Sequence, residues 1–200
     1  MITADEALQK LMEGNQRYVA YQMKGQKLCD PTTRRALVKG QSPYAIILCC
    51  SDSRVPPEII FDQGLGEIFV VRVAGNVADP IVLGSIEYAA EHLGSPLMMV
   101  LGHSRCGAVT AAVTEGKAEG NIGAILETLS PAVQAAQEAA KGRTPAEVVE
   151  AAADQNVKLV CSSLVTQSTI IKHLVDHGKL KIVGAKYDLD DGKVSLFEGQ

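Results

Sequence analysis

Two short segments of the sequence carry side chains that can bind a metal ion. Cys50 begins the segment Cys-Ser-Asp-Ser-Arg, and His103 and Cys106 frame the segment His-Ser-Arg-Cys. Two thiolates and one imidazole form a soft donor set that suits zinc. Three protein ligands leave the fourth tetrahedral position open, whereas structural zinc sites usually fill all four. The pattern therefore favours a catalytic site with one zinc ion per chain.

Asp52 and Arg54 place a carboxylate and a guanidinium beside the first of these ligands. Asp52 lies two positions after Cys50, so its carboxylate can reach the metal or a water bound to it. Arg54 can hold that carboxylate through two hydrogen bonds and keep it ionised. An ionised carboxylate only accepts hydrogen bonds, so Asp52 would fix where the proton of a bound hydroxide points. We therefore expect Asp52 and Arg54 to act in catalysis.

Each segment alone is weak evidence for catalysis, and the spacing leaves alternatives open. A cysteine is often an inert core residue, and aspartate–arginine pairs are common on protein surfaces. A structural zinc site or a histidine satisfied in the core would fit the same spacing. His173 and His177 are four residues apart, but we interpret them as side chains at the end of a helix. We expect Cys49, which neighbours Cys50 on a strand, to point into the core.

Strands and helices alternate along the chain, which predicts the elements that position these segments. We expect strands at residues 44–50, 67–73, 96–101, 180–187 and 193–197. Apolar periodicity and capping residues predict helices at residues 4–20, 31–39, 57–61, 80–93 and 107–114, within 121–155 with a break at Gly142, and at 156–176. The class is α/β: a central, mostly parallel sheet with one antiparallel edge strand and helices on both faces.

The predicted strands bring the two segments together. Cys50 and His103 each lie at the carboxyl end of a strand, where open α/β sheets form their sites. If the first and third strands are neighbours, about 5 Å separates them. One metal ion can bridge that distance.

Length and composition limit the possible functions. The 200 residues fit a single domain, 1–200, which we divide into an N-terminal helical arm, 1–40, and an α/β core, 41–200. A net charge of −4, 4% aromatic residues and no tryptophan argue against a nucleic-acid partner. The longest apolar runs, about seven residues, are too short to span a membrane. The acidic start lacks the features of a signal peptide, and five irregularly spaced cysteines favour a reducing compartment, so we expect a cytoplasmic protein.

Beyond these patterns, the sequence resembles the β-class carbonic anhydrases. The strings CSDSRVPPEIIFDQGLGEIFVVRVAGN and VLGHSRCGAV carry the resemblance, which covers most of the chain and includes SIEYAAEHL and IVGAKYDLDDGKV. It implies reversible hydration of carbon dioxide to bicarbonate and a proton by zinc-bound hydroxide. It also implies that Cys50, His103 and Cys106 are the zinc ligands, and that Asp52 and Arg54 are the catalytic pair.

The resemblance further implies a substrate pocket and an assembly. Gln41 matches a glutamine that hydrogen-bonds substrate in the plant-like branch, and Phe69 and Tyr88 match residues lining the active-site cleft at a dimer interface. Gly107 matches a glycine whose backbone lies close to the site. Members of the family are dimers or multiples of dimers whose N-terminal helices pack on the neighbouring subunit. We therefore expect a homodimer or a higher homo-oligomer.

The resemblance also predicts an open site at neutral pH. In one form of the family, the aspartate leaves its arginine and binds zinc, and that form carries a tryptophan three residues before the first cysteine ligand. This chain has Ile47 there. We expect Asp52 to stay paired with Arg54 at neutral pH and to be a possible metal ligand only at low pH.

Two other functions remain as alternatives. Relatives of this fold hydrolyse carbonyl sulfide or carbon disulfide, which could react with the same hydroxide. A non-catalytic zinc protein with a role in assembly is the second alternative, although the Asp52–Arg54 pair argues against it.

Overall fold

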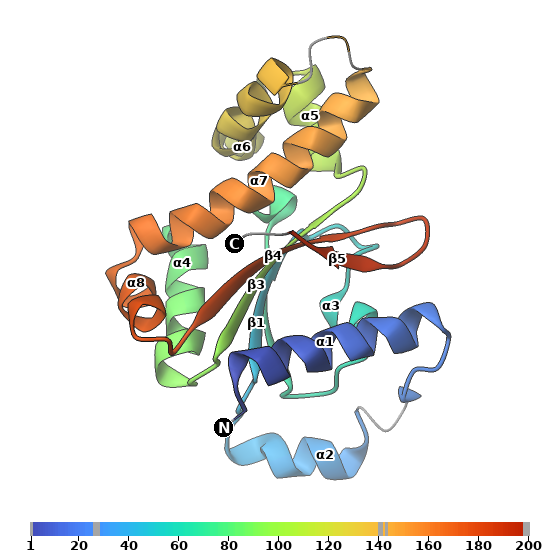
Figure 1. The fold of residues 1–200 in the computed structure, drawn as a ribbon, viewed down its shortest axis with the longest axis vertical. Coiled ribbons are helices and arrows are strands. Elements are labelled where there is room, and N and C mark those ends of the chain that lie inside the picture. Colours follow the sequence, from blue (N-terminus) through green and yellow to red (C-terminus); the bar gives the residue numbers. More distant parts are fainter. Residues whose placement is uncertain (1, 26–28, 140–141, 143, 198–200) are drawn as a thin grey trace.

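A five-stranded sheet forms the centre of this computed structural model, which describes residues 2–25, 29–139, 142 and 144–197 (Figure 1). The strands lie in the order β2-β1-β3-β4-β5. β1 to β4 are parallel, and β5 runs antiparallel to β4 at one edge. Their bounds are Ala45–Cys49 (β1), Ile68–Arg72 (β2), Leu97–His103 (β3), Lys181–Tyr187 (β4) and Val194–Leu196 (β5). The predicted α/β class is confirmed, and β1 and β3 are neighbours.

Helices connect the strands, and several begin at the capping residues that the sequence identifies. Thr3 forms a capping box with Glu6, and Asp30 and Asp79 accept N–H groups of the helices that follow them. The α-helices are Ala4–Val19 (α1), Pro31–Ala36 (α2), Pro57–Ile60 (α3), Pro80–Glu87 (α4), Gly107–Thr114 (α5), Gly120–Ala139 (α6), Pro145–Gln167 (α7) and Thr169–Asp176 (α8). In the part of the chain that the structure describes, no helix combines the length and apolar character needed to cross a membrane.

The sheet buries different side chains on its two faces. Ile47 and Met99 pack in one cluster with Leu11 of α1. Ile46 and Met98, each one position earlier, pack in another cluster with α4 and α7. This division follows from the alternation of side chains along a strand. Helices therefore cover both faces, as predicted.

A third apolar cluster lies beyond the carboxyl ends of the strands. The helices α5, α6 and α7 pack together there, at one end of the molecule in Figure 1. Cys50 and Cys106 belong to this cluster, together with side chains such as Leu129 and Val149. The helical layer therefore removes both cysteines from water.

Most boundaries differ from those predicted by one or two residues, and three differences bear on the arrangement of the elements. β3 continues to His103, two residues beyond the predicted end, because its backbone pairs with β4 up to Tyr187. The helix after Asp79 ends in a π-helical turn at Tyr88–His92 (η4). The predicted break between residues 155 and 156 is wrong, since α7 runs through Asn156 without interruption. The break comes at Ser168, whose hydroxyl caps α8 by accepting the N–H of Ile171.

The N-terminal segment packs on its own chain. The stripe of α1 that contains Ala7 and Leu11 is fully buried against the sheet, and Lys10 lies over the ring of Tyr44. α2, in contrast, has no buried residue. Packing of the N-terminal helices on a neighbouring subunit therefore stays a prediction.

β3 and α7 approach one another closely at Gly102. A Cβ atom there would lie 2.6 Å from Cγ2 of Val157, whereas carbon atoms in ordinary contact are about 3.5–4.0 Å apart. Val157 is itself buried in the cluster between the sheet and α7, so it has little room to move. Only glycine fits this approach without a shift of the helix.

We predict that Gly102→Ala lowers the free energy of unfolding by about 1–3 kcal/mol, the usual cost of overpacking a core. Urea denaturation measures the loss. Val157→Ala supplies the control, because removing Cγ2 makes room for the new methyl group. The double variant should then lose less stability than the sum of the two single variants, and strictly additive losses would contradict the clash.

Candidate metal centre

Three soft ligand atoms meet at the carboxyl edge of the sheet. The ligand atoms of Cys50, His103 and Cys106 all lie within 4.8 Å of one another, and the three residues are buried. The two Sγ atoms are 3.9 Å apart. Two thiolates bound tetrahedrally at zinc–sulfur distances of about 2.3 Å would be about 3.8 Å apart. The spacing therefore fits a shared metal ion with little movement.

The strand register explains why these side chains converge. Cys49, the last residue of β1, pairs with Leu101 of β3, so Cys50 and His103 both follow that pair on adjacent parallel strands. Cys106 is the N-cap residue of α5, which packs with α6 and α7 beyond the carboxyl ends of the strands. The predicted meeting of the two segments is therefore present in the structure.

The hydrogen bond of His103 leaves one ring nitrogen available for a metal. Nδ1 lies 2.9 Å from the carbonyl oxygen of Ser104, and it must carry the proton to donate to that acceptor. Nε2 is buried and has no hydrogen-bond partner among the described residues. A buried acceptor without a partner is unfavourable, and a metal ion would satisfy it.

The two neighbouring cysteines on β1 differ sharply in acidity. Burial raises the pKa of Cys49 to about 12. The hydrogen bond from Cys106, together with the N–H groups of Asp52 and Gly75, lowers the pKa of Cys50 to about 4. The pKa of Cys106 rises in turn, because the two sulfurs share one proton. Without a metal ion, the pair therefore holds one thiolate.

Asp52 and Arg54 form a side-on ion pair next to the cluster. Nε and Nη2 of Arg54 donate to the two carboxylate oxygens of Asp52 at 2.9 and 2.7 Å. These bonds hold the pKa of Asp52 well below its usual range, against the opposing effect of burial. Asp52 thus lies beside the group of three ligands but outside it, engaged with Arg54.

Two further residues support Cys50, and the sequence analysis missed both. Arg72, at the end of β2, donates to the carbonyl oxygens of Cys50 and Asp52 at 3.1 and 2.7 Å. Asn156 of α7 donates to the carbonyl oxygen of Gly75 at 2.8 Å, and the N–H of Gly75 contacts the Cys50 sulfur. The charge of Arg72 at the end of an apolar strand was the one available signal.

The residues that the resemblance assigns to substrate do not all lie near the ligands within one chain. Gly107 directly follows Cys106, and a Cβ atom there would meet nothing within 4 Å. Gln41 precedes β1 and Cys50 follows it, so the five-residue strand, about 17 Å long, lies between them. Phe69 pairs with Ile46, also far from Cys50 along the strand. Tyr88 lies beside Phe69, with ring centroids 6.3 Å apart.

Comparison with known protein families shows which family this chain resembles in sequence. The family model described as carbonic anhydrase matches residues 45–194. A protein of Mycobacterium tuberculosis named carbonic anhydrase 2 is 42% identical over 195 residues, covering 95% of this chain and 91% of that protein. A carbonic anhydrase of Mycolicibacterium smegmatis is 43% identical over 197 residues, with the same two coverages.

Solved structures agree with this placement. The β-carbonic anhydrase CafA of Aspergillus fumigatus has a TM-score of 0.78 and 28% identity, covering 84% of this chain and 81% of that one. A tetrameric β-carbonic anhydrase of Sordaria macrospora has a TM-score of 0.79 and 25% identity, covering 97% of this chain and 98% of that one.

We predict that metal-free protein contains a thiolate at about pH 6, where an ordinary thiol with a pKa of about 8.5 is almost fully protonated. Ultraviolet thiolate absorbance after removal of metal with a chelator measures it. Cys50→Ser should abolish this absorbance, and Cys161→Ser, at a buried thiol in another cluster, should leave it unchanged. A titration that begins only above about pH 8 would contradict the lowered pKa of Cys50.

Proposed function

The chain belongs to the β-class carbonic anhydrases, whose reaction is the reversible hydration of carbon dioxide, and we propose that it binds one zinc ion through Cys50, His103 and Cys106. One observation carries the proposal: two sulfurs and a buried, unpartnered imidazole nitrogen lie together at the ends of adjacent strands. The 3.9 Å between the two sulfurs suits an ion with tetrahedral coordination.

Zinc bound there would lower the pKa of a water molecule to about 7 and so supply hydroxide at neutral pH. Asp52 is ionised and only accepts hydrogen bonds, so it would orient the proton of the attacking group and leave a lone pair facing carbon dioxide. Arg54 holds the carboxylate at both oxygens and keeps it in this orientation. We propose that Asp52 keeps this pairing at neutral pH, which is the open form of the site.

We also propose that the protein is a homodimer or a higher homo-oligomer whose substrate pocket takes residues from two copies. Gln41, Phe69 and Tyr88 lie away from the ligands of their own chain. β2 is an edge strand with partly buried apolar side chains, and Tyr88 beside it is 49% exposed. An uncovered apolar edge favours pairing with another chain. A Gln41 side chain from that copy could donate to the oxygen that gains charge, with Gly107 leaving space beside the ligands.

The remaining proposals concern the domain organisation and the cellular location of the protein. We propose a single domain, 1–200, with the arm at 1–40 and the core at 41–200. The family match at residues 45–194, which contains β1 to β4 and reaches the first residue of β5, supports this division. A cytoplasmic location is supported by the buried free thiols at Cys49, Cys50, Cys106 and Cys161, which suit a reducing compartment.

We predict that Cys50→Ser loses both zinc and activity, because one of three ligands is gone. Metal analysis and stopped-flow hydration of carbon dioxide measure the two losses, and carbonyl sulfide hydrolysis run alongside tests the alternative substrate. Cys161→Ser is the control and should keep its zinc. Full zinc content in Cys50→Ser would contradict the ligand assignment, and zinc-loaded wild-type protein without hydration above background would contradict the proposed reaction.

A second prediction tests the shared pocket. Co-expressed Cys50→Ser and Gln41→Ala chains should regain activity in mixed dimers, because Cys50 of one chain then faces Gln41 of the other. Isolated mixed dimers are assayed for carbon dioxide hydration. A mixture of Gln41→Ala with the double variant Cys50→Ser/Gln41→Ala is the control, since it offers no intact site. Absence of recovery, or a solution mass near 21.2 kDa by light scattering, would contradict the proposal.

A further inference from the structure

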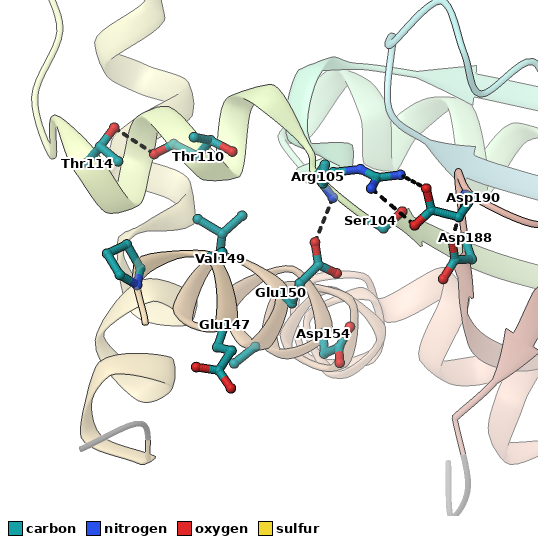
Figure 2. Close-up of a pocket in the computed structure, with 13 residues that line it drawn as sticks. Ser104, Arg105, Thr110, Thr114, Glu147, Val149, Glu150, Asp154, Asp188 and Asp190 are labelled. Atoms are coloured by element: carbon teal, nitrogen blue, oxygen red, sulfur yellow. Dashed lines mark hydrogen bonds and ion pairs between the residues drawn. The ribbon is translucent and has the colours of Figure 1, made fainter. Parts of the chain in front are cut away.

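The loop between His103 and Cys106 is held from outside the ligand cluster by a carboxylate of α7. Glu150 Oε1 accepts the backbone N–H of Arg105 at 2.8 Å, and Figure 2 shows the Glu150 side chain extending from the helix toward that group. Arg105 has a φ of 51°, in the left-handed region that residues with side chains rarely adopt. The shape of this loop therefore depends on partners such as Glu150.

The peptide group held by Glu150 also orients His103. This group joins Ser104 to Arg105: its N–H donates to Glu150, and its carbonyl oxygen accepts from Nδ1 of His103 at 2.9 Å. In a planar trans peptide these two groups point in opposite directions, so fixing one fixes the other. Hydrogen bonds in series polarise one another, so a carboxylate on the N–H makes the carbonyl a stronger acceptor.

The following peptide group connects the same loop to the catalytic pair. The carbonyl oxygen of Arg105 accepts from Nη2 of Arg54 at 3.4 Å, and the same nitrogen donates to Asp52 at 2.7 Å. The Arg105 side chain is bound separately, through two hydrogen bonds to Asp190 that Figure 2 also shows. The backbone of Arg105 thus lies between Glu150 on one side and Arg54 on the other.

Lys186 places Glu150 for this contact. Its Nζ lies 2.7 Å from Oε2 of Glu150, which leaves Oε1 for the loop. Burial raises the pKa of Glu150, but the hydrogen bonds from Lys186 and Arg105 outweigh it and hold the pKa below its usual value. Glu150 lines a cavity of about 780 Å³ that Cys50, His103 and Cys106 do not line. The carboxylate therefore acts on the centre only through the intervening backbone.

We propose that Glu150 is a positioning residue of the metal centre, which sets the ring of His103 by holding the Ser104–Arg105 peptide. Through the same loop it also supports the contact between Arg105 and Arg54. The inference rests on the proposed metal site, because it assigns Glu150 no contact with substrate or metal.

Asp154 provides a matched control. It lies one turn after Glu150 on α7, and it pairs with the same lysine at the same distance of 2.7 Å. Its side chain is 34% exposed, against 35% for Glu150. Its carboxylate pairs with Lys186 and, in the described part of the chain, makes no hydrogen bond to the loop. Asp154→Asn therefore disturbs the same ion-pair cluster while leaving the Arg105 N–H bound.

The test is competition for zinc between the loaded protein and a chromophoric chelator. Glu150→Ala should hold zinc more weakly, by up to about 10–100-fold, which is the usual loss when the direct partner of a metal-ligating histidine is removed. Glu150→Gln keeps an oxygen that accepts the N–H, so it should recover part of that loss. Asp154→Asn should hold zinc as the wild type does. Each of the three substitutions removes one of the two carboxylates paired with Lys186, so thermal unfolding of the metal-free variants separates zinc affinity from folding.

Two results would overturn the inference while leaving the metal site intact. The first is Glu150→Ala releasing zinc no more readily than Asp154→Asn, and the second is Glu150→Gln performing no better than Glu150→Ala. Wild-type protein that takes up no zinc is a distinct outcome, because it would overturn the proposed metal site and the inference together.

Discussion

The structure depends on gathering three metal-binding side chains that are almost fully buried. A buried imidazole nitrogen without a partner destabilises a fold by about 1–3 kcal/mol, and sharing one proton between two buried thiols adds to the constraint. The adjacent ends of β1 and β3 supply the geometry, and the layer of α5, α6 and α7 supplies the burial. A metal ion would bind all three ligand atoms at once. The arrangement that is unfavourable without a metal ion therefore favours binding of the ion.

Much of this arrangement could be predicted from the sequence, because the relevant features are local. Continuous apolar runs identified the strands, and capping residues such as Thr3 and Asp79 identified helix starts. Cys50, His103 and Cys106 stood out because few residue types bind zinc. The continuity of α7 through Asn156 could not be predicted, since the alanine-rich stretch before Asn156 contains nothing that distinguishes a break from a continuous helix.

The side chains that support the metal-binding loops could not be predicted from sequence patterns, for a different reason. Arg72, Asn156 and Glu150 all act on backbone groups of segments far away in the chain, and a backbone group has no residue type to recognise. The resemblance named Gln41, Phe69 and Tyr88 as candidates for the substrate pocket, yet their separation from Cys50 became visible only with the sheet register. That separation is why the substrate pocket has to be considered at the level of two chains.

The parallel pairing of β1 with β3 also bears on how the protein acquires its metal. Cys50 and Cys106 are 56 residues apart, and a complete crossover through β2 and α4 separates them along the chain. Parallel pairings of this kind form slowly, because closing a long loop costs conformational entropy before the strands form any stabilising contact. In a nascent chain, His103 and Cys106 are already close together, but the third ligand, Cys50, joins them only when β1 pairs with β3. A metal ion bound by all three residues would therefore complete an assembled sheet instead of starting its assembly.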